Sequence, residues 1–342
     1  MKKFNYLIYI GRFSPFHNGH EAVLKQACEM AEKVIVVVGS TNQPRTIKNP
    51  WNFVERKQMI LAAMGSSHTN YVVVAAKDKP YNDQKWVRDI QNTIDSVIAE
   101  DDYIAVPNPH KIGIIGHSKD ESSFYLKLFP QWSVVEVPNF QGINATQIRE
   151  EMFAVKQHVY PTVSKAVESY IVDWMKTPGF YVLVEEYFYI QAYKNSWDRA
   201  PYAPTFVTVD AVVVQSGHVL MIKRRAAPGR GLGALPGGFV NQNERLLDAA
   251  IRELREETKI KVPEAVLRGS VKTSHVFDTP NRSLRGRTIT HAYLIELPAG
   301  DLPKVKGNDD AEKAKWIPLN ELDESKCFED HYHIIQYFLG QI

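Results

Sequence analysis

Apolar runs of strand length alternate with helical patterns throughout the first half of the chain. Between the runs, apolar residues recur at helical spacing over 21–33, 53–64, 85–98 and 122–128. The runs themselves have the composition of parallel strands buried on both faces, and they occupy residues 6–10, 33–40, 71–76, 111–117 and 133–137. This alternation predicts an α/β domain with a doubly wound, Rossmann-like parallel sheet, in which ligands bind beyond the carboxyl ends of the strands.

The first expected strand is followed by a turn rich in glycine and histidine. Residues 11–20 read Gly-Arg-Phe-Ser-Pro-Phe-His-Asn-Gly-His, and a helical pattern begins directly afterwards. The imidazoles of His17 and His20 would therefore lie beside the free N–H groups and the positive dipole end of a helix, where phosphate binds. Gly11 lets a ligand approach the backbone, and Arg12 adds a fixed positive charge. A turn with two incidental histidines is the alternative, but the glycine, arginine and proline beside them favour a phosphate site.

Further polar segments follow the other expected strands. Residues 39–45 and 116–120 lie at strand ends. Because the carboxyl ends of parallel strands meet at one edge of a sheet, we expect these segments to converge with residues 11–20. Thr146 and Arg149 lie three positions apart near the start of a later helix, so that a hydroxyl and a guanidinium can contact the same anion.

Residues 11–20 resemble the signature of the HxGH nucleotidyltransferase superfamily, and most closely that of the archaeal-type nicotinamide mononucleotide (NMN) adenylyltransferases. Similar segments are residues 49–56 (Asn-Pro-Trp-Asn-Phe-Val-Glu-Arg), 81–86 (Tyr-Asn-Asp-Gln-Lys-Trp), 116–123 and 143–149 (Ile-Asn-Ala-Thr-Gln-Ile-Arg). Asn144 is a mild departure, because the superfamily usually has serine at that position. The resemblance implies transfer of the adenylyl group of ATP to NMN, with Mg²⁺ assisting and with the NMN phosphate as the nucleophile.

The resemblance also implies roles for individual residues of this half. Cationic imidazole and guanidinium groups would stabilise the phosphates, which gives the candidate catalytic residues Arg12, His17, His20, Thr146 and Arg149. Trp86 would stack on the pyridine ring, whose positive charge an indole face attracts, although a core aromatic is the alternative. The other candidate substrate-binding residues are Gly11, Phe13, Gly39, Asn82, Gly116, Asp120 and Ile143.

The second half contains a glycine pair followed by an acidic helical pattern. Gly237 and Gly238 precede Glu244, and residues 252–257 read Arg-Glu-Leu-Arg-Glu-Glu. On a helix the three glutamates at 253, 256 and 257 share one sector beside an apolar stripe, where they repel one another. A hard divalent cation such as Mg²⁺ or Mn²⁺ would relieve that repulsion. A solvated acidic face is the alternative.

This pattern resembles the Nudix box, which implies an α/β/α Nudix fold and hydrolysis of a nucleoside pyrophosphate by an activated water. By resemblance the metal ligands are Glu253, Glu256, Glu257 and the Gly237 carbonyl, with Glu253 and Glu257 as catalytic residues. Arg252 and Glu244 would brace these carboxylates. Lys259 departs from the box, which usually has glycine there, so we expect a changed exit from the helix. Residues 277–287 resemble a segment of ADP-ribose pyrophosphatases and supply the candidate substrate-binding residues Arg282 and Arg285. The candidates for a further catalytic carboxylate are Asp309, Asp310 and Glu312.

The two halves are expected to be separate domains. We place the first at 1–178, a linker at 179–204 and the Nudix domain at 205–342. An aromatic-rich stretch over 180–197 is expected to be a helix at the junction, and residues 199–204 to be extended. Helical pattern also covers 155–176.

Composition limits the partners and the compartment. Lysine and arginine number 41 against 39 aspartate and glutamate, so a net charge of +2 gives no case for a nucleic-acid or membrane partner. Cys28 and Cys327 have no metal-binding spacing and are expected as buried thiols. The N-terminus lacks a full signal peptide, which predicts a cytoplasmic protein. Assembly of the chain into a homo-oligomer is compatible with the sequence.

Together the two motifs predict a bifunctional enzyme of NAD metabolism. One domain would make NAD and pyrophosphate from NMN and ATP, and the other would hydrolyse ADP-ribose to AMP and ribose 5-phosphate. The same folds acting on nicotinic acid mononucleotide or on other nucleoside diphosphate derivatives are an alternative. A Nudix domain that senses ADP-ribose without catalysis is another, although the glutamates of the box are all present.

Overall fold

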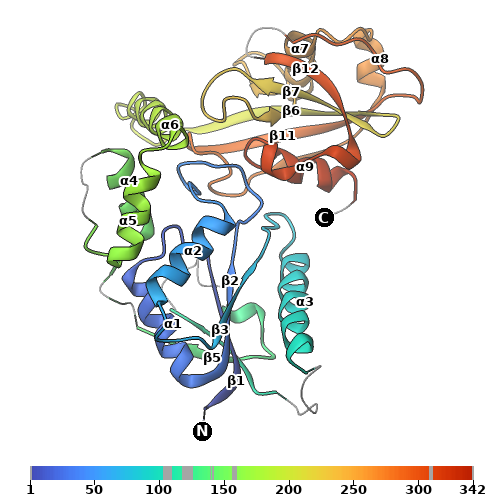
Figure 1. The fold of residues 1–342 in the computed structure, drawn as a ribbon. Coiled ribbons are helices and arrows are strands. Elements are labelled where there is room, and N and C mark those ends of the chain that lie inside the picture. Colours follow the sequence, from blue (N-terminus) through green and yellow to red (C-terminus); the bar gives the residue numbers. More distant parts are fainter. Residues whose placement is uncertain are drawn as a thin grey trace. The chain divides into compact units, whose positions relative to one another are not determined.

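The chain divides into two compact units, Met1–Val184 and Glu185–Ile342, in a computed structural model (Figure 1). The structure describes residues 2–102, 110–117, 126–138, 140, 142–155, 160–307 and 311–340. The division falls inside helix α6 (Pro178–Asn195), which is the helix expected at the junction. Part of the segment expected as a linker, 179–204, is therefore regular helix. In the described residues no helix is both long enough and apolar enough to cross a membrane.

The first unit is built on a parallel sheet of strand order β3-β2-β1-β4-β5. Its strands coincide with the expected apolar runs: β1 (Phe4–Gly11), β2 (Ala31–Val38), β3 (Tyr71–Ala75), β4 (Ile112–Gly116) and β5 (Ser133–Glu136). The order reverses on either side of β1, which pairs with β2 and with β4. In such sheets ligands bind where the order reverses, so the turn that follows β1 lies where a site is expected.

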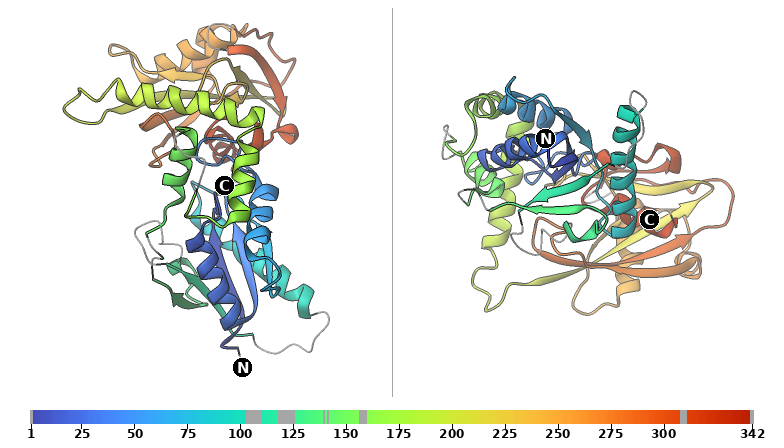
Figure 2. Two further views of the ribbon diagram at one scale, coloured as in Figure 1. Left: turned by 60° about the vertical axis from the view of Figure 1, so that its left-hand side comes forward. Right: turned by 90° about the horizontal axis from the view of Figure 1, so that it is seen from below.

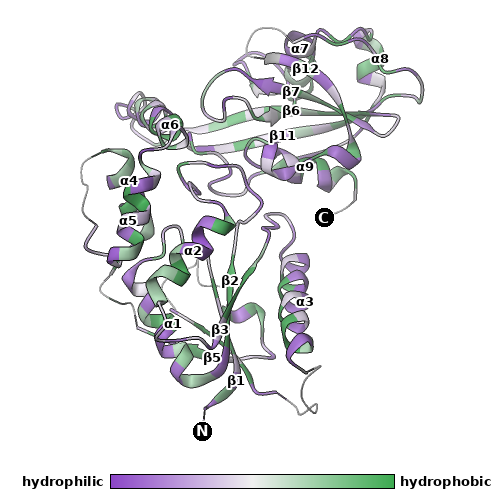
Figure 3. Cartoon of the chain, viewed as in Figure 1, coloured by the Kyte–Doolittle hydropathy of each residue, from purple (hydrophilic) through white to green (hydrophobic). Residues whose placement is uncertain are grey.

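Helices cover the sheet because they present apolar faces to it. Helix α3 (Asp83–Asp102) packs Ile90 and Ile94 against Ile8 and Ile35 of the sheet, and Figure 3 shows hydrophobic and hydrophilic residues interspersed along α3. Helices α1 (Asn18–Met30) and α2 (Phe53–Met64) also contact the strands, and α2 contacts α5 (Lys165–Trp174). The doubly wound architecture predicted from the sequence is confirmed (Figure 2).

Two of the predicted helix limits differ from the structure. The helix expected over 21–33 ends at Met30, because Ala31 already begins β2. Within the described part of the helix expected over 155–176, the α-helix is α5, whose start is fixed by the side chain of Ser164, which accepts a hydrogen bond from the N–H of Val167. Most of the helix expected over 122–128 lies outside the described residues.

The second unit contains a mixed sheet of order β10-β11-β6-β7-β12, to which β8 and β9 add beside β7 and β6. Helix α7 (Leu246–Thr258) packs Ala250 and Leu254 on this sheet. The described part of this unit also contains the helices α8 (Glu264–Gly269) and α9 (His331–Phe338). The strands are β6 (Thr205–Gln215), β7 (His218–Arg224), β8 (Gly233–Ala234), β9 (Gly237–Phe239), β10 (Val271–Phe277), β11 (Arg287–Glu296) and β12 (Ala311–Pro318).

Candidate active sites

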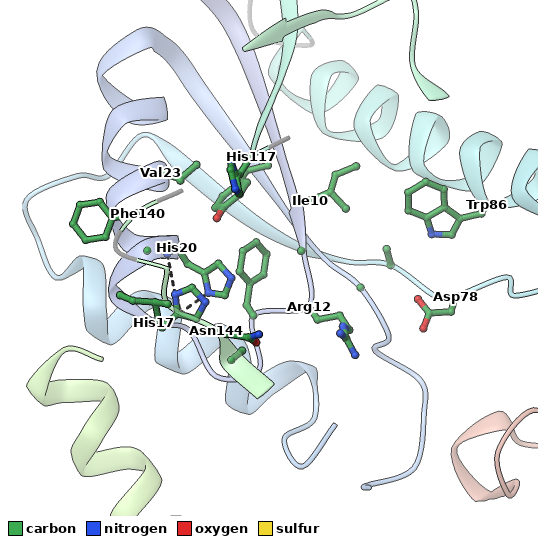
Figure 4. A pocket seen from close by; sticks show the side chains of 18 of the residues that line it. Ile10, Arg12, His17, His20, Val23, Asp78, Trp86, His117, Phe140 and Asn144 are labelled. Carbon is green, nitrogen blue, oxygen red and sulfur yellow. Dashed lines mark hydrogen bonds between the residues drawn. The ribbon is translucent and has the colours of Figure 1, made fainter. Parts of the chain in front are cut away.

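A cavity of about 610 Å³ opens at the carboxyl edge of the first sheet. Figure 4 shows His17 and His20 toward one side of it, Trp86 and Asp78 toward the other, and Arg12 between them. Segments that are far apart in the sequence therefore meet here, as the parallel topology requires. The predicted site residues that line the cavity are Gly11, Arg12, Phe13, His17, His20, Gly39, Trp86 and Ile143.

The two histidines are held together by the start of α1. The Nδ1 of His17 accepts a hydrogen bond from the N–H of His20, and the Nδ1 of His20 accepts one from the N–H of His17, each at 3.3 Å. The rings stack with centroids 3.5 Å apart. Because both Nδ1 atoms accept hydrogen bonds, each neutral ring carries its proton on Nε2, from which it can donate to a phosphate oxygen.

The charge of His20 differs from the sequence expectation of cationic imidazoles. Burial, and next the neighbouring His17, hold the pKa of His20 well below its usual range. The His20 ring is therefore neutral at neutral pH and acts through its N–H group. The Phe13 ring packs edge-on against the His20 ring, with the ring centroids 5.0 Å apart. A side chain at Gly11 would meet the Phe13 ring at 2.8 Å, so this position requires glycine.

Helix α4 (Ala145–Phe153) brings Arg149 to the same turn. The side chain of Asn144 accepts a hydrogen bond from the Thr146 N–H at 2.8 Å, so the departure from serine still caps the helix. Arg149 is buried and donates to the Ser14 carbonyl at 2.5 Å and to the Thr146 hydroxyl at 3.0 Å. Thr146 and Arg149 do not line the cavity itself, and Arg149 instead anchors the histidine turn to α4.

Arg12 lines the cavity, and the cations of Lys48 and Arg149 lie within electrostatic reach of it. Burial, and next the nearby Arg12, lower the pKa of Arg149 to about 10. Burial and the positive charges of Arg12 and Arg149 also lower the pKa of Lys48. Asp78 is the opposing charge, fixed by the Ser40 hydroxyl at 2.6 Å. Mutual repulsion of this kind favours a polyanion, and sequence reasoning identified neither Lys48 nor Asp78.

Of the remaining predicted residues of this unit, Trp86 lines the cavity, whereas Asn82 and Gly116 do not. Trp86 is half-buried and lies 5.9 Å from Phe129, ring centre to ring centre. Asn82 does not line the cavity; its side chain accepts a hydrogen bond from the Lys85 N–H at 2.8 Å, and so caps the helix that carries Trp86. Gly116 ends β4 outside the lining, and Asp120 lies outside the described residues.

In the second unit the glycine pair lies close to two neighbouring segments. A side chain at Gly237 would meet the Val209 carbonyl of β6 at 2.2 Å, and one at Gly238 would meet the Glu253 carboxylate at 2.6 Å. Only glycine therefore lets β9 fit between β6 and α7. The Gly237 N–H donates to Glu257 at 2.9 Å, which fixes that carboxylate against the strand.

Arg252 holds the outer carboxylates of the box, as the resemblance implies. Its guanidinium donates to Glu244 at 2.6 Å, to Glu253 at 2.8 Å and to Glu256 at 3.1 Å. These hydrogen bonds from Arg252 are the main reason that the pKa of Glu244 falls to about 2. Within the described segments no three acidic, histidine or cysteine side chains already form a closed metal site.

The donor set nevertheless has the chemistry of a divalent-cation site. Glu257 is buried, and burial together with the charges of Glu253 and Asp210 raises its pKa to about 8. Burial also raises the pKa of Glu253. Buried carboxylates that repel one another are stabilised by Mg²⁺ or Mn²⁺, which prefer oxygen ligands. Glu256 lies at the exposed edge of this group.

The two arginines predicted for the Nudix substrate differ in their surroundings. The structure corrects the prediction that Arg282 binds substrate. Its side chain is 3% exposed and donates two hydrogen bonds to Asp330, at 2.7 and 2.9 Å, so it forms a buried ion pair and not a phosphate contact. Arg285 lies over the Phe239 ring at 5.2 Å and within electrostatic reach of Arg224, a residue the sequence did not single out. Asp309, Asp310 and the side chain of Glu312 lie outside the described residues.

Lys259 ends α7 in the left-handed conformation, with φ 47°, where the box usually has glycine. We expect Lys259→Gly to raise the free energy of unfolding of this unit by about 0.5–1 kcal/mol, because glycine removes the steric cost of positive φ. Urea unfolding measures the change. Lys261→Gly, two positions on and outside the positive-φ residues, is the control and should destabilise. A loss of stability in Lys259→Gly would contradict this explanation.

Comparison with known proteins matches the two halves of the chain to two different families. Residues 8–151 match the cytidylyltransferase-like family and residues 204–338 match the NUDIX domain family. Over 157 residues the chain is 38% identical to a nicotinamide/nicotinic acid mononucleotide adenylyltransferase of Acinetobacter baylyi, covering 46% of this chain and 79% of that protein. Over 133 residues it is 35% identical to an ADP-ribose pyrophosphatase of Methanocaldococcus jannaschii, covering 39% of this chain and 72% of that protein.

The fold and the two sites define a nucleotidyltransferase domain and a Nudix domain joined in one chain. A crystal structure of a bifunctional NMN adenylyltransferase/ADP ribose pyrophosphatase from Francisella tularensis, complexed with AMP and a manganese ion, is 35% identical. The match covers 99% of both chains with a TM-score of 0.89. The chain belongs to this family of bifunctional NMN adenylyltransferases/ADP-ribose pyrophosphatases.

Proposed function

We propose that the first unit transfers the adenylyl group of ATP to NMN, releasing pyrophosphate, at the cavity beyond β1. An NMN phosphate oxygen attacks the α-phosphorus, and the bond to the β-phosphate bridging oxygen breaks. The observation that carries this proposal is the pair of imidazoles of His17 and His20, each with its Nδ1 held by a backbone N–H, in one cavity with Arg12. Fixed donors of this kind stabilise charge that develops on transferring phosphates.

Positioning accounts for the rest of the catalysis. The cavity places an aromatic side chain, Trp86, across from the histidine side, so one reactant can lie with its pyridine ring at the indole and its phosphate toward Arg12 (Figure 4). Holding two reactants in line supplies much of the rate enhancement in such reactions. One relative named above is a nicotinamide/nicotinic acid mononucleotide adenylyltransferase. We assign NMN as the acceptor here and test the nicotinic acid analogue beside it.

Trp86→Ala is expected to raise the KM for NMN by about 10-fold or more, the cost of losing one stacked ring. The KM for ATP should change little, because the indole does not face the phosphates. Trp86→Phe is the matched control and should retain most of the affinity. Initial rates at varied NMN and varied ATP measure both constants. Equal increases of the two KM values would assign Trp86 to the core and not to the pyridine ring.

We further propose that the second unit hydrolyses ADP-ribose to AMP and ribose 5-phosphate with Mg²⁺ or Mn²⁺ bound by Glu253, Glu256, Glu257 and the Gly237 carbonyl. The ion, when bound, acidifies a water and neutralises pyrophosphate charge. Arg252 keeps Glu253 and Glu256 on the metal side of α7, and Gly237 fixes Glu257. Arg285 and Arg224 supply positive charge near this group for the substrate phosphates.

The direct test is an assay of the purified chain with each substrate. We expect NAD from NMN and ATP, and AMP from ADP-ribose, each only with Mg²⁺ or Mn²⁺ present. Nicotinic acid mononucleotide and NADH are the comparison substrates for the two units. Tight binding of ADP-ribose without any AMP formation would instead identify the second unit as a sensor.

A further inference from the structure

Arg56 is among the largest fully buried side chains of the described residues, with 1% of its surface exposed, and it touches no carboxylate directly. It lies in the first turn of α2, directly after Glu55, which pairs instead with Arg45 at 2.7 Å. Burial lowers its pKa to about 10, so the guanidinium stays charged at neutral pH. A buried charge persists only where hydrogen bonds satisfy it.

The hydrogen bonds of Arg56 all go to backbone carbonyls, and two of these carbonyls belong to residues that line the cavity, Arg12 and Gly39. Its Nη1 donates to the carbonyls of Arg12 and Gly39, both at 2.8 Å, and its Nη2 donates to that of Ser40 at 3.0 Å. Its Nε donates to the Asn52 carbonyl, at the N-cap of its own helix, at 3.3 Å. One planar group therefore joins the turn after β1, the turn after β2 and the start of α2.

Both of these turns contain a residue in the left-handed region that is not glycine. Phe13, which follows the Arg12 carbonyl, has φ 52°, and Ser40 has φ 54°. Such a residue costs about 1 kcal/mol or more and persists where its surroundings hold it. The turns matter for the cavity, because Phe13 supports His20 and Ser40 fixes Asp78 through its hydroxyl.

We propose that Arg56 is a positioning residue for adenylyl transfer, which fixes the Arg12 turn and the Gly39–Ser40 turn relative to each other. It would touch neither substrate, and it acts through Arg12, Phe13 and the Ser40–Asp78 contact. The inference rests on the adenylyltransferase activity proposed above. A single ammonium cannot span these carbonyls as the guanidinium fork does, so lysine is not an equivalent replacement even though it keeps the charge.

The test compares Arg56→Lys and Arg56→Ala with Arg88→Lys, which makes the same change at an exposed arginine of α3. We expect Arg56→Lys to lower kcat/KM for adenylyl transfer by about 10- to 100-fold, the cost of displacing reacting groups by about 1 Å. ADP-ribose hydrolysis by the same samples should stay unchanged. Rates are measured well below the melting temperature and are divided by the fraction of folded protein. If Arg56 only stabilised the fold, these corrected rates would equal the wild-type rates.

Chemical rescue provides the second measurement. Guanidinium ions should restore the rate of Arg56→Ala at least tenfold, with saturation, whereas methylammonium should not. Wild-type kinetics in Arg56→Lys, or folded Arg56→Ala that guanidinium does not rescue, would overturn the proposal. If Arg56→Ala does not fold, Arg56→Lys alone decides. A wild-type chain without adenylyl transfer would refute the proposed activity itself, which separates the two failures.

Discussion

Replacing His20 by alanine is expected to lower kcat for adenylyl transfer by about 10²- to 10³-fold, the usual cost of removing one fixed donor from a developing negative charge. The Nε2–H of His20 is one of the paired donors of the cavity, and its Nδ1 also accepts the His17 N–H. Alanine removes both functions at once. Because the ring is neutral, the loss reflects a missing hydrogen bond and not a missing charge.

Two variants separate these functions. His20→Gln can still reach back to the His17 N–H as in a capping box, so it should restore the helix start without restoring full activity. His68→Ala removes a histidine that precedes β3, at the opposite edge of the sheet from the site, and should have no effect. Steady-state rates with NMN and ATP measure kcat. A wild-type kcat in His20→Ala would remove the histidine pair from the mechanism.

Glu257→Gln is expected to lower ADP-ribose hydrolysis by about 10³-fold, because a metal ion contributes several kcal/mol of charge stabilisation that this carboxylate would help to hold. Glutamine keeps an oxygen for the Gly237 N–H, so the contact between β9 and α7 survives. It also removes a buried negative charge whose pKa is raised to about 8. The variant should therefore fold, and it should be more stable than the wild type without metal.

The stability of Glu257→Gln follows from the sign of the pKa shift. A carboxyl whose pKa is raised in the folded state makes the metal-free protein lose stability as the pH rises from about 4.5 toward 8, and glutamine does not ionise. Thermal unfolding with and without Mn²⁺ measures this. Glu264→Gln, at a partly exposed carboxylate of α8, is the control. Undiminished hydrolysis by Glu257→Gln would show that the metal is held elsewhere.

Local patterns in the sequence were sufficient to predict the fold and part of each site. The buried runs predicted the strands from β1 to β5, because apolar composition reports burial on both faces. The resemblance to the Nudix box predicted that Arg252 and Glu244 brace the carboxylates, and in the structure Arg252 donates hydrogen bonds to Glu244 and Glu253. Such signals lie within one element or one turn, where residue spacing translates directly into geometry.

The parts that sequence reasoning missed depend on contacts between distant segments. Lys48 follows β2 and Asp78 follows β3, and nothing in their local sequence shows that their charges lie near each other or that Asp78 lines the cavity. Arg56 belongs to a segment singled out by resemblance, but its contacts with the Arg12 and Gly39 carbonyls could not be read from that segment. Arg282 was misassigned because a loop arginine cannot be distinguished by spacing from one that pairs with Asp330, 48 positions later. The predicted start of the helix over 155–176 was wrong because a single N-cap residue, Ser164, determines where α5 begins.

The most direct test of two independent phosphate sites in one chain is to measure both reactions on three proteins: wild type, His20→Ala and Glu257→Gln. We predict that His20→Ala loses NAD formation and keeps ADP-ribose hydrolysis, while Glu257→Gln shows the reverse. Loss of both reactions in either variant, or of neither in both, would contradict the assignment of histidines to one site and glutamates to the other.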